Sequence, residues 1–144
     1  MALGNPYQQY KKTQIDTANQ GKLIVMLYDG AIKFINKAIE LIPQKKDDPN
    51  KIEEIHNCIV RTKEIIGELI ASLNMDVGDI SQRLLSIYIY VNKKLTEANL
   101  KKEAEPLIEI RKYLIELREA WEEAVKKTPT QIVNSDNGGV NIAT

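Results

Sequence analysis

Residues 23–42 carry apolar side chains over most of the circumference of a predicted helix. At about 100° per residue, the polar residues of this segment share one narrow stripe, and the apolar residues together with Gly30 fill an arc of about 220°. A helix that packs against neighbours on one side needs an apolar arc of only about 100–140°. We therefore expect this helix either to be the central helix of a bundle or to contact a molecule outside its own fold as well.

Three further segments have the apolar periodicity of helices. Residues 49–73 follow Asp48, a good N-cap, and start with a proline at the first helical position. Residues 80–99 come after a loop that contains Gly78, and residues 106–128 are expected to end at Thr128-Pro129. Apolar residues recur at spacings of three and four, which predicts one buried seam on each helix. The expected core positions are Ile52, Ile55, Ile59, Thr62, Ile66, Leu69 and Leu73 in the first segment, Leu84, Ile87, Tyr88, Val91, Leu95 and Ala98 in the second, and Leu107, Ile110, Leu114, Leu117, Trp121 and Ala124 in the third.

The number and length of these helices predict the fold class. Four helices of about 20–25 residues with short links favour antiparallel neighbours, so we expect an all-α protein, an antiparallel up-down four-helix bundle. Residues 17–128 would form the bundle and residues 1–16 an N-terminal arm. Residues 129–144 contain Gly138-Gly139 and no helical period, which predicts a disordered tail.

The charge balance and the few special residues narrow the functional classes. Lys plus Arg and Asp plus Glu number 20 each, so no basic excess favours nucleic-acid binding. Cys58 is the only cysteine, which excludes an internal disulfide. The first ten residues lack the pattern of a secretory leader, and the apolar run 23–28 is too short to span a bilayer. We expect a cytoplasmic protein that does not bind membranes.

Glu53 and His56 have the Glu-x-x-His spacing that di-iron helical bundles use twice. Here the motif cannot occur twice, because His56 is the only histidine, and both residues lie off the predicted core seam. No phosphate-binding glycine loop and no nucleophile motif is present in the sequence. We therefore expect no metal, no cofactor and no enzymatic activity.

Several apolar or small residues have no place in the predicted core, and they suggest an interaction surface. They are Val60, Gly67 and Ala71 on the second helix, Leu85 and Ile89 on the third, and Ile108 and Ile115 on the fourth. Their recurrence on three helices predicts one contiguous patch, of the kind that marks a site for a protein partner. The alternative is structural: a homodimer in which these residues of one copy meet those of the other.

Several sequence blocks resemble the flagellin-specific export chaperone family, FliS. They are NPYQQY at residues 5–10, MLYDGAIKFI at residues 26–35, LLSIYIY at residues 84–90 and LREAW at residues 117–121. The resemblance runs from residue 5 to about residue 125. Ile89 departs from it, because the family more often has a polar or acidic residue between the two tyrosines.

The resemblance implies a cytosolic helical bundle without enzymatic activity. Such a protein would bind the C-terminal segment of flagellin, prevent premature polymerisation and support delivery to the flagellar type III export apparatus. The arm, with Tyr7, Tyr10 and Ile15, would lie over part of the client groove, and Tyr7 and Tyr10 match the family's pair of arm residues. The sequence leaves open a second partner, such as a co-chaperone or an anti-sigma factor.

Overall fold

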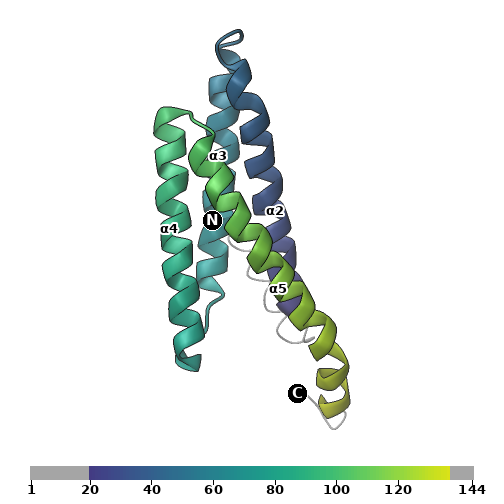
Figure 1. Ribbon diagram of the computed structural model, residues 1–144. Coiled ribbons are helices and arrows are strands. Elements are labelled where there is room, and N and C mark those ends of the chain that lie inside the picture. The colour runs from purple at the N-terminus through teal and green to yellow at the C-terminus, as the bar shows by residue number, and fades with distance from the viewer. Residues whose placement is uncertain (1–19, 137–144) are drawn as a thin grey trace, which may run out of the picture. The chain divides into compact units, whose positions relative to one another are not determined.

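The computed structural model describes residues 20–136, and it describes side chains as far as residue 127. These residues contain four long helices and no strand (Figure 1). The helices are α2 (Gln20–Leu41), α3 (Asn50–Ala71), α4 (Asp79–Lys101) and α5 (Glu105–Asp136). Two links contain short 3-10 helices, η1 (Ile42–Gln44) and η2 (Met75–Val77). The predicted all-α class is thus confirmed. The predicted arm, with Tyr7, Tyr10 and Ile15, lies outside the described residues.

The chain divides into two compact units. Residues 27–116 form one unit, and the described residues on either side of them, 20–26 and 117–136, belong to the other. The first unit holds most of α2, all of α3 and α4, and the start of α5, so it contains every predicted contact residue outside the arm. The up-and-down order of the whole chain and its predicted domain boundaries stay predictions.

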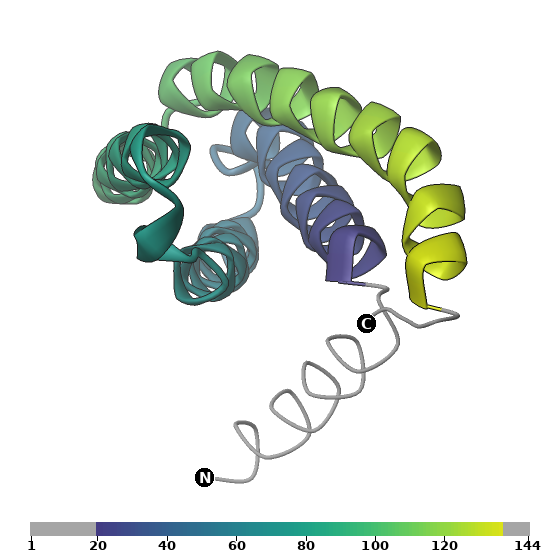
Figure 2. The same cartoon turned by 90° about the horizontal axis from the view of Figure 1, so that it is seen from below.

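Within the unit of residues 27–116, α3 and α4 lie side by side and run in opposite directions (Figure 2). Lys63 Nζ donates to Thr96 Oγ1 over 2.6 Å, and Asn99 Nδ2 lies 3.0 Å from His56 Nδ1. His56 precedes Lys63 on α3, whereas Asn99 follows Thr96 on α4, so the two helices are antiparallel. These two contacts also define which residues of the two helices lie at the same level.

The seam predicted for α3 is buried except near its ends. The buried members are Ile55, Ile59, Thr62, Ile66 and Leu69. Leu73 is half-buried, and Ile52 is 45% exposed, contrary to the prediction. By the register of the Lys63–Thr96 and His56–Asn99 contacts, Ile55 is level with residues 100–104 and Ile52 with residues 103–107, which lie after the end of α4 at Lys101.

The broad apolar arc of α2 is used on more than one side. Tyr28, Ala31, Ile35, Ala38, Leu41 and, just beyond the helix, Ile42 are buried. Phe34 is half-buried on another side, where the Arg61 guanidinium carbon lies 5.8 Å from its ring centroid. A Cβ added to Gly30 would lie 3.2 Å from Ile65 Cδ1, so α2 and α3 approach each other closely there. Within residues 27–41, the wide arc is thus explained by neighbouring helices on several sides.

One polar contact lies inside the core. The hydroxyl groups of Tyr28 and Tyr88 are 2.5 Å apart, and both side chains are buried. Burial raises the pKa of the Tyr88 hydroxyl, and the hydrogen bond with Tyr28 opposes that shift only in part. This contact joins α2 to α4 across the core.

α5 differs from the prediction in two respects. Its backbone stays helical to Asp136, beyond the expected end at Thr128-Pro129, so Pro129 is accommodated despite lacking the N–H that a helix interior uses. The rest of the predicted tail, residues 137–144, lies outside the described residues. Leu117 and Trp121 are only half-buried and Ala124 is exposed, because they belong to the other unit, where residues 20–26 are the only other described helix.

Candidate functional site

Four of the predicted contact residues lie together along the edge between α3 and α4. Because the helices are antiparallel and Lys63 contacts Thr96 while His56 contacts Asn99, Gly67 is level with residues 88–92 of α4, the turn that contains Ile89. Ala71, one turn further along α3, is level with residues 84–88, the turn that contains Leu85. Ile89 is 57% exposed, Gly67 and Ala71 are exposed, and Leu85 is half-buried. We call these four residues the α3/α4 face.

Gly67 is not required by the fold of the described residues. A Cβ built on it would meet no atom within 4 Å, in contrast to the close contact at Gly30. Glycine in a helix interior costs about 1 kcal/mol relative to alanine. The α3 backbone at Gly67 is therefore open to close approach by another molecule.

Val60 is separated from this face by polar side chains. It is half-buried and lies two helical turns before Gly67, about 10 Å along the helix axis. The Lys63–Thr96 and His56–Asn99 contacts lie on either side of it. The structure thus places Val60 in a bridged, polar part of the same edge.

Ile108 and Ile115 lie on a different side of the unit. Arg111, between them on α5, donates from Nη1 to Asn36 Oδ1 of α2 over 2.8 Å. Residues three and four apart share a helix face, so both isoleucines face the α2 side of α5. They are 45% and 38% exposed. We call Ile108, Arg111 and Ile115 the α5/α2 face.

The opposite flank of α5 faces α4. Tyr90 of α4 donates to Glu109 Oε2 over 2.5 Å, and the rings of Tyr90 and Tyr113 are 6.3 Å apart. The hydrogen bond to Glu109 raises the pKa of the Tyr90 hydroxyl. Because α5 meets α4 on one flank and α2 on the other, the α5/α2 face does not join the α3/α4 face. The expectation that all these residues form one contiguous patch stays a prediction, because periodicity gives the angle of a residue on its own helix but not the neighbour at that angle.

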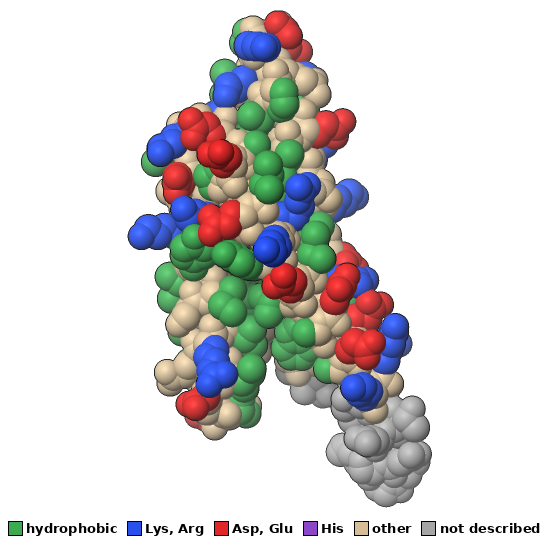
Figure 3. Space-filling view, in the orientation of Figure 1, with side chains coloured by type: hydrophobic (Ala, Val, Ile, Leu, Met, Phe, Trp, Pro, Cys, Tyr) green, Lys and Arg blue, Asp and Glu red, His purple; other side chains and the backbone are tan. Residues whose placement is uncertain are grey.

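Exposed apolar residues that the sequence analysis did not select lie near the start of α4. Met75 and Val77 of η2 and Ile80 of α4 are 43%, 57% and 58% exposed. Figure 3 shows hydrophobic side chains gathered over the half of α4 that is nearer Gly78. The signal was present in the sequence, since a predicted loop with two large apolar residues, Met75 and Val77, is unusual.

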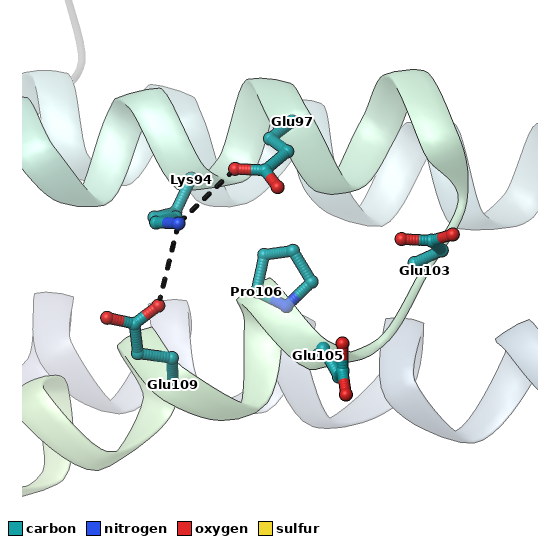
Figure 4. A pocket seen from close by; sticks show the side chains of 6 residues that line it. All are labelled: Lys94, Glu97, Glu103, Glu105, Pro106 and Glu109. Atoms are coloured by element: carbon teal, nitrogen blue, oxygen red, sulfur yellow. Dashed lines mark hydrogen bonds and ion pairs between the residues drawn. The ribbon is translucent and has the colours of Figure 1, made fainter.

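A small polar pocket lies where α4 turns into α5 (Figure 4). Its volume is about 170 Å³, and it is lined by Lys94, Glu97, Glu103, Glu105, Pro106 and Glu109. Lys94 Nζ is 3.3 Å from Glu97 Oε1 and 3.8 Å from Glu109 Oε1. The hydrogen bond with Glu97 raises the pKa of Lys94, so this ammonium group stays charged in the physiological range. The pocket already contains its own cation.

Within the described residues, no group of three or more His, Cys, Asp or Glu side chains is arranged to hold a metal ion. Glu53 and His56 are both exposed, and His56 contacts Asn99. Cys58 is half-buried, and burial raises the pKa of its thiol, which disfavours the reactive thiolate. No helix among the described residues is long and apolar enough to cross a membrane.

Comparisons with known proteins cover most of the chain. A family model described as flagellar protein FliS matches residues 3–128. The chain is 33% identical over 126 residues to the flagellar secretion chaperone FliS of Bacillus subtilis, which covers 88% of this chain and 90% of that relative. It is 30% identical over 118 residues to the protein of that name from Campylobacter jejuni, covering 81% of this chain and 88% of the relative. The corresponding protein of Vibrio cholerae is 29% identical over 121 residues, which cover 81% of this chain and 85% of the relative.

Proposed function

Because the chain belongs to the flagellar protein FliS family, we propose that it binds the C-terminal segment of flagellin, prevents premature polymerisation of that segment in the cytoplasm and supports its delivery to the flagellar export apparatus. The observation that carries the proposal is the open α3/α4 face. It combines two exposed small residues on one helix with Leu85 and Ile89 on the next.

The geometry of this face suits a helical client. An amphipathic helix can lay its apolar side into a groove between two helices, with anchors at spacings of three and four residues. Gly67 lets the client approach the α3 backbone, and Leu85 with Ile89 supplies apolar area one turn apart on α4. A segment that orders only on binding loses entropy, which lowers the net affinity and suits a client that must later be released.

The α5/α2 face extends the proposal to a second stretch of the client. One straight helix cannot contact both faces, since they lie on different flanks of the unit. We assign a second helical stretch of flagellin to Ile108 and Ile115, joined to the first by a segment that passes around the unit. Val60 is not part of this assignment, because polar side chains bridge the edge on both sides of it.

The role of the arm stays as the sequence suggested it. Tyr7, Tyr10 and Ile15 are the arm residues that can make apolar contacts, and a tyrosine can bury its ring while its hydroxyl remains in water. We propose that the arm covers part of the client surface in the free chaperone and competes with the client for it. A short arm with three anchors offsets only a small part of the interface of a long helical client.

Calorimetric titration with a flagellin C-terminal peptide tests the assignment. Leu85→Glu together with Ile89→Glu introduces two carboxylates into the α3/α4 face and should abolish detectable binding, a loss of at least about a hundredfold in affinity. Ile52→Glu is the matched control, because Ile52 is also an exposed apolar helix residue but lies beyond the end of α4. Its peptide affinity should equal that of the parent.

Circular dichroism must show both variants folded. Full affinity in the folded double variant would rule out the α3/α4 face as the client site. Sedimentation of the parent chain addresses the homodimer alternative: a tight dimer whose formation is lost with the same double variant would favour the structural role over client binding.

A further inference from the structure

The outer side of α2 carries an open hollow of about 440 Å³ that lies outside both client faces. It belongs to the unit of residues 27–116, and most of its exposed lining is apolar. Hollows of about 300–1,000 Å³ have the size of sites that bind ligands. The lining residues all belong to α2, and they are Lys33, Phe34, Asn36, Lys37 and Glu40. We call this feature the α2 hollow.

Phe34 supplies the aromatic part of the lining, on the side that meets α3. Its side chain is half-buried, and the Arg61 guanidinium carbon lies 5.8 Å from the ring centroid. One turn earlier, at Gly30, the two helices approach so closely that an added Cβ would lie 3.2 Å from Ile65 Cδ1. The ring therefore projects from a backbone that a neighbouring helix holds in place, and a partner would lose little entropy in ordering it.

Asn36 lies on the side of the hollow that meets α5. Its Oδ1 accepts a hydrogen bond from Arg111 Nη1 over 2.8 Å. Ile108 and Ile115 lie about one turn before and after Arg111, and both are more than one-third exposed. These contacts join the α2 hollow to the α5/α2 face, so a client stretch on that face passes beside the hollow.

The lining and borders of the hollow carry more cations than carboxylates. Lys33 and Lys37 line it together with Glu40, whose Oε1 lies 4.0 Å from Lys37 Nζ. Arg61 and Arg111 stand at the two borders, and each contacts a neutral group, an aromatic ring and an amide oxygen. A guanidinium has five N–H donors, so both arginines can still bind a carboxylate.

Other carboxylates on the three helices do not cancel this excess. Glu54 of α3 lies 3.7 Å from Lys51, and Glu109 of α5 lies on the flank that faces α4. Asp29 is one turn before Lys33 but does not line the hollow. The four cations at the lining and borders therefore exceed the carboxylates by three, or by two when Asp29 is counted. Such a rim complements an acidic partner and repels a basic one.

We propose that the second client stretch, the one assigned to Ile108 and Ile115, inserts an apolar side chain into the α2 hollow and places a carboxylate on its basic rim. The second face thus selects an acidic amphipathic helix, in which an Asp or Glu lies about one turn from an apolar anchor. This inference rests on the proposed function, because it states which chemistry of the client the second face recognises.

Calorimetric titration with the flagellin C-terminal peptide tests the rim. Lys33→Glu together with Lys37→Glu reverses its charge at two exposed positions. The matched control is Lys46→Glu with Lys101→Glu, two exposed lysines near the opposite end of α4 from Gly78. Both double variants change the net charge equally, and in each of them one lysine has a glutamate of its own helix within 4.0 Å. A second peptide, with every Asp and Glu replaced by Asn and Gln, completes the cycle.

We expect the rim variant to bind the acidic peptide at least about tenfold more weakly than the parent, and the control to stay within about twofold. With the amide peptide, the parent and the rim variant should have the same affinity within about twofold. An equal loss with both peptides would reject the carboxylate and overturn the proposal.

The remaining outcomes separate this inference from the proposed function. If the folded rim variant keeps full affinity while Leu85→Glu with Ile89→Glu abolishes it, only the α2 hollow is wrong. If the rim variant keeps full affinity but loses self-association in sedimentation, the hollow belongs to a contact with a second copy and the proposal is overturned. If the parent binds neither peptide, the proposed function fails and this inference fails with it.

Phe34→Ala tests the apolar part of the hollow. It should weaken binding of the acidic peptide about fivefold or more, whereas Ile52→Ala, at an exposed apolar position beyond the end of α4, should leave it unchanged. Unchanged affinity in a folded Phe34→Ala variant would overturn the insertion of an apolar side chain. Should this variant prove unfolded by circular dichroism, the two exposed lysines of the rim variant still decide the outcome.

Discussion

The two halves of the α3–α4 edge differ although they belong to the same pair of helices. In the half nearer η1, which we call the bridged half, Lys63 and His56 of α3 reach across to Thr96 and Asn99 of α4. In the half nearer η2, which we call the open half, Gly67, Ala71, Leu85 and Ile89 leave the edge apolar. The core seam continues under both halves, so the difference lies at the edge alone.

The polar contacts of the two halves are also placed differently. The bridged half has its polar pairs at the surface, whereas beneath the open half the hydroxyl pair of Tyr28 and Tyr88 is buried in the core. Exposed pairs contribute little to stability, because each partner is well hydrated when apart. We infer that the Lys63–Thr96 and His56–Asn99 contacts contribute little to the stability of the fold. Their main effect is to exclude a client helix from the bridged half.

The largest expected effect tests whether the core is the same under both halves. Ile59→Ala lies under the bridged half and Ile66→Ala under the open half, and both side chains are buried. Each variant should lower the free energy of unfolding by about 2–5 kcal/mol, because each leaves a cavity. Denaturant unfolding of the two variants measures the costs side by side. A loss at Ile66 several-fold smaller than at Ile59 would show that the open half is poorly packed, and the comparison would then concern the core as well as the edge.

Periodicity in the sequence was enough to predict the helices and most of the core. The spacing of Ile55, Ile59, Ile66 and Leu69 sets their angle on the helix, and burial follows from that angle. Ile52 has a suitable angle and is still exposed, because its burial depends on where α4 ends. That end is a property of two helices in register and cannot be read from one helix alone.

The candidate site could be predicted only in part. The open half was found because Gly67, Leu85 and Ile89 do not fit a core seam. Ile108 and Ile115 lie on a different flank from this half, which the sequence could not show, because it does not say that α5 meets α2 on that flank. The exposed apolar residues near the start of α4 were missed because residues 74–79 were interpreted as an ordinary loop. The hydrogen bonds that fix this turn join backbone and side chains across several positions.

An intermediate effect is expected at Gly67, with opposite signs for folding and binding. Gly67→Ala should raise the free energy of unfolding by up to about 1 kcal/mol, because alanine favours the helix and its Cβ meets no atom within 4 Å. If a client helix passes close to this backbone, the same methyl group should lower peptide affinity about tenfold or more. Thermal unfolding measures the change in stability, and calorimetric titration measures the change in peptide affinity. Gly30→Ala is the contrasting control, because its Cβ would press on Ile65 inside the unit. If the Gly67→Ala variant were more stable but bound the peptide with unchanged affinity, the client helix would not pass close to the α3 backbone at Gly67.

The smallest effect is expected from opening the bridged half. Thr96→Val keeps the shape of the side chain but removes the oxygen that accepts from Lys63 Nζ. The free energy of unfolding should change by no more than about 0.5 kcal/mol, since the exposed ammonium group returns to water. Peptide affinity should stay within about twofold of the parent, because the client is assigned to the open half. Denaturant unfolding and calorimetric titration of the same preparation measure both quantities.

A gain in affinity of about tenfold would mean that the Lys63–Thr96 contact normally keeps the client away from Val60. The client surface would then extend into the bridged half once this contact is removed. A loss of that size would instead mean that the client contacts the bridge itself, and the boundary between the two halves would have to be moved toward His56.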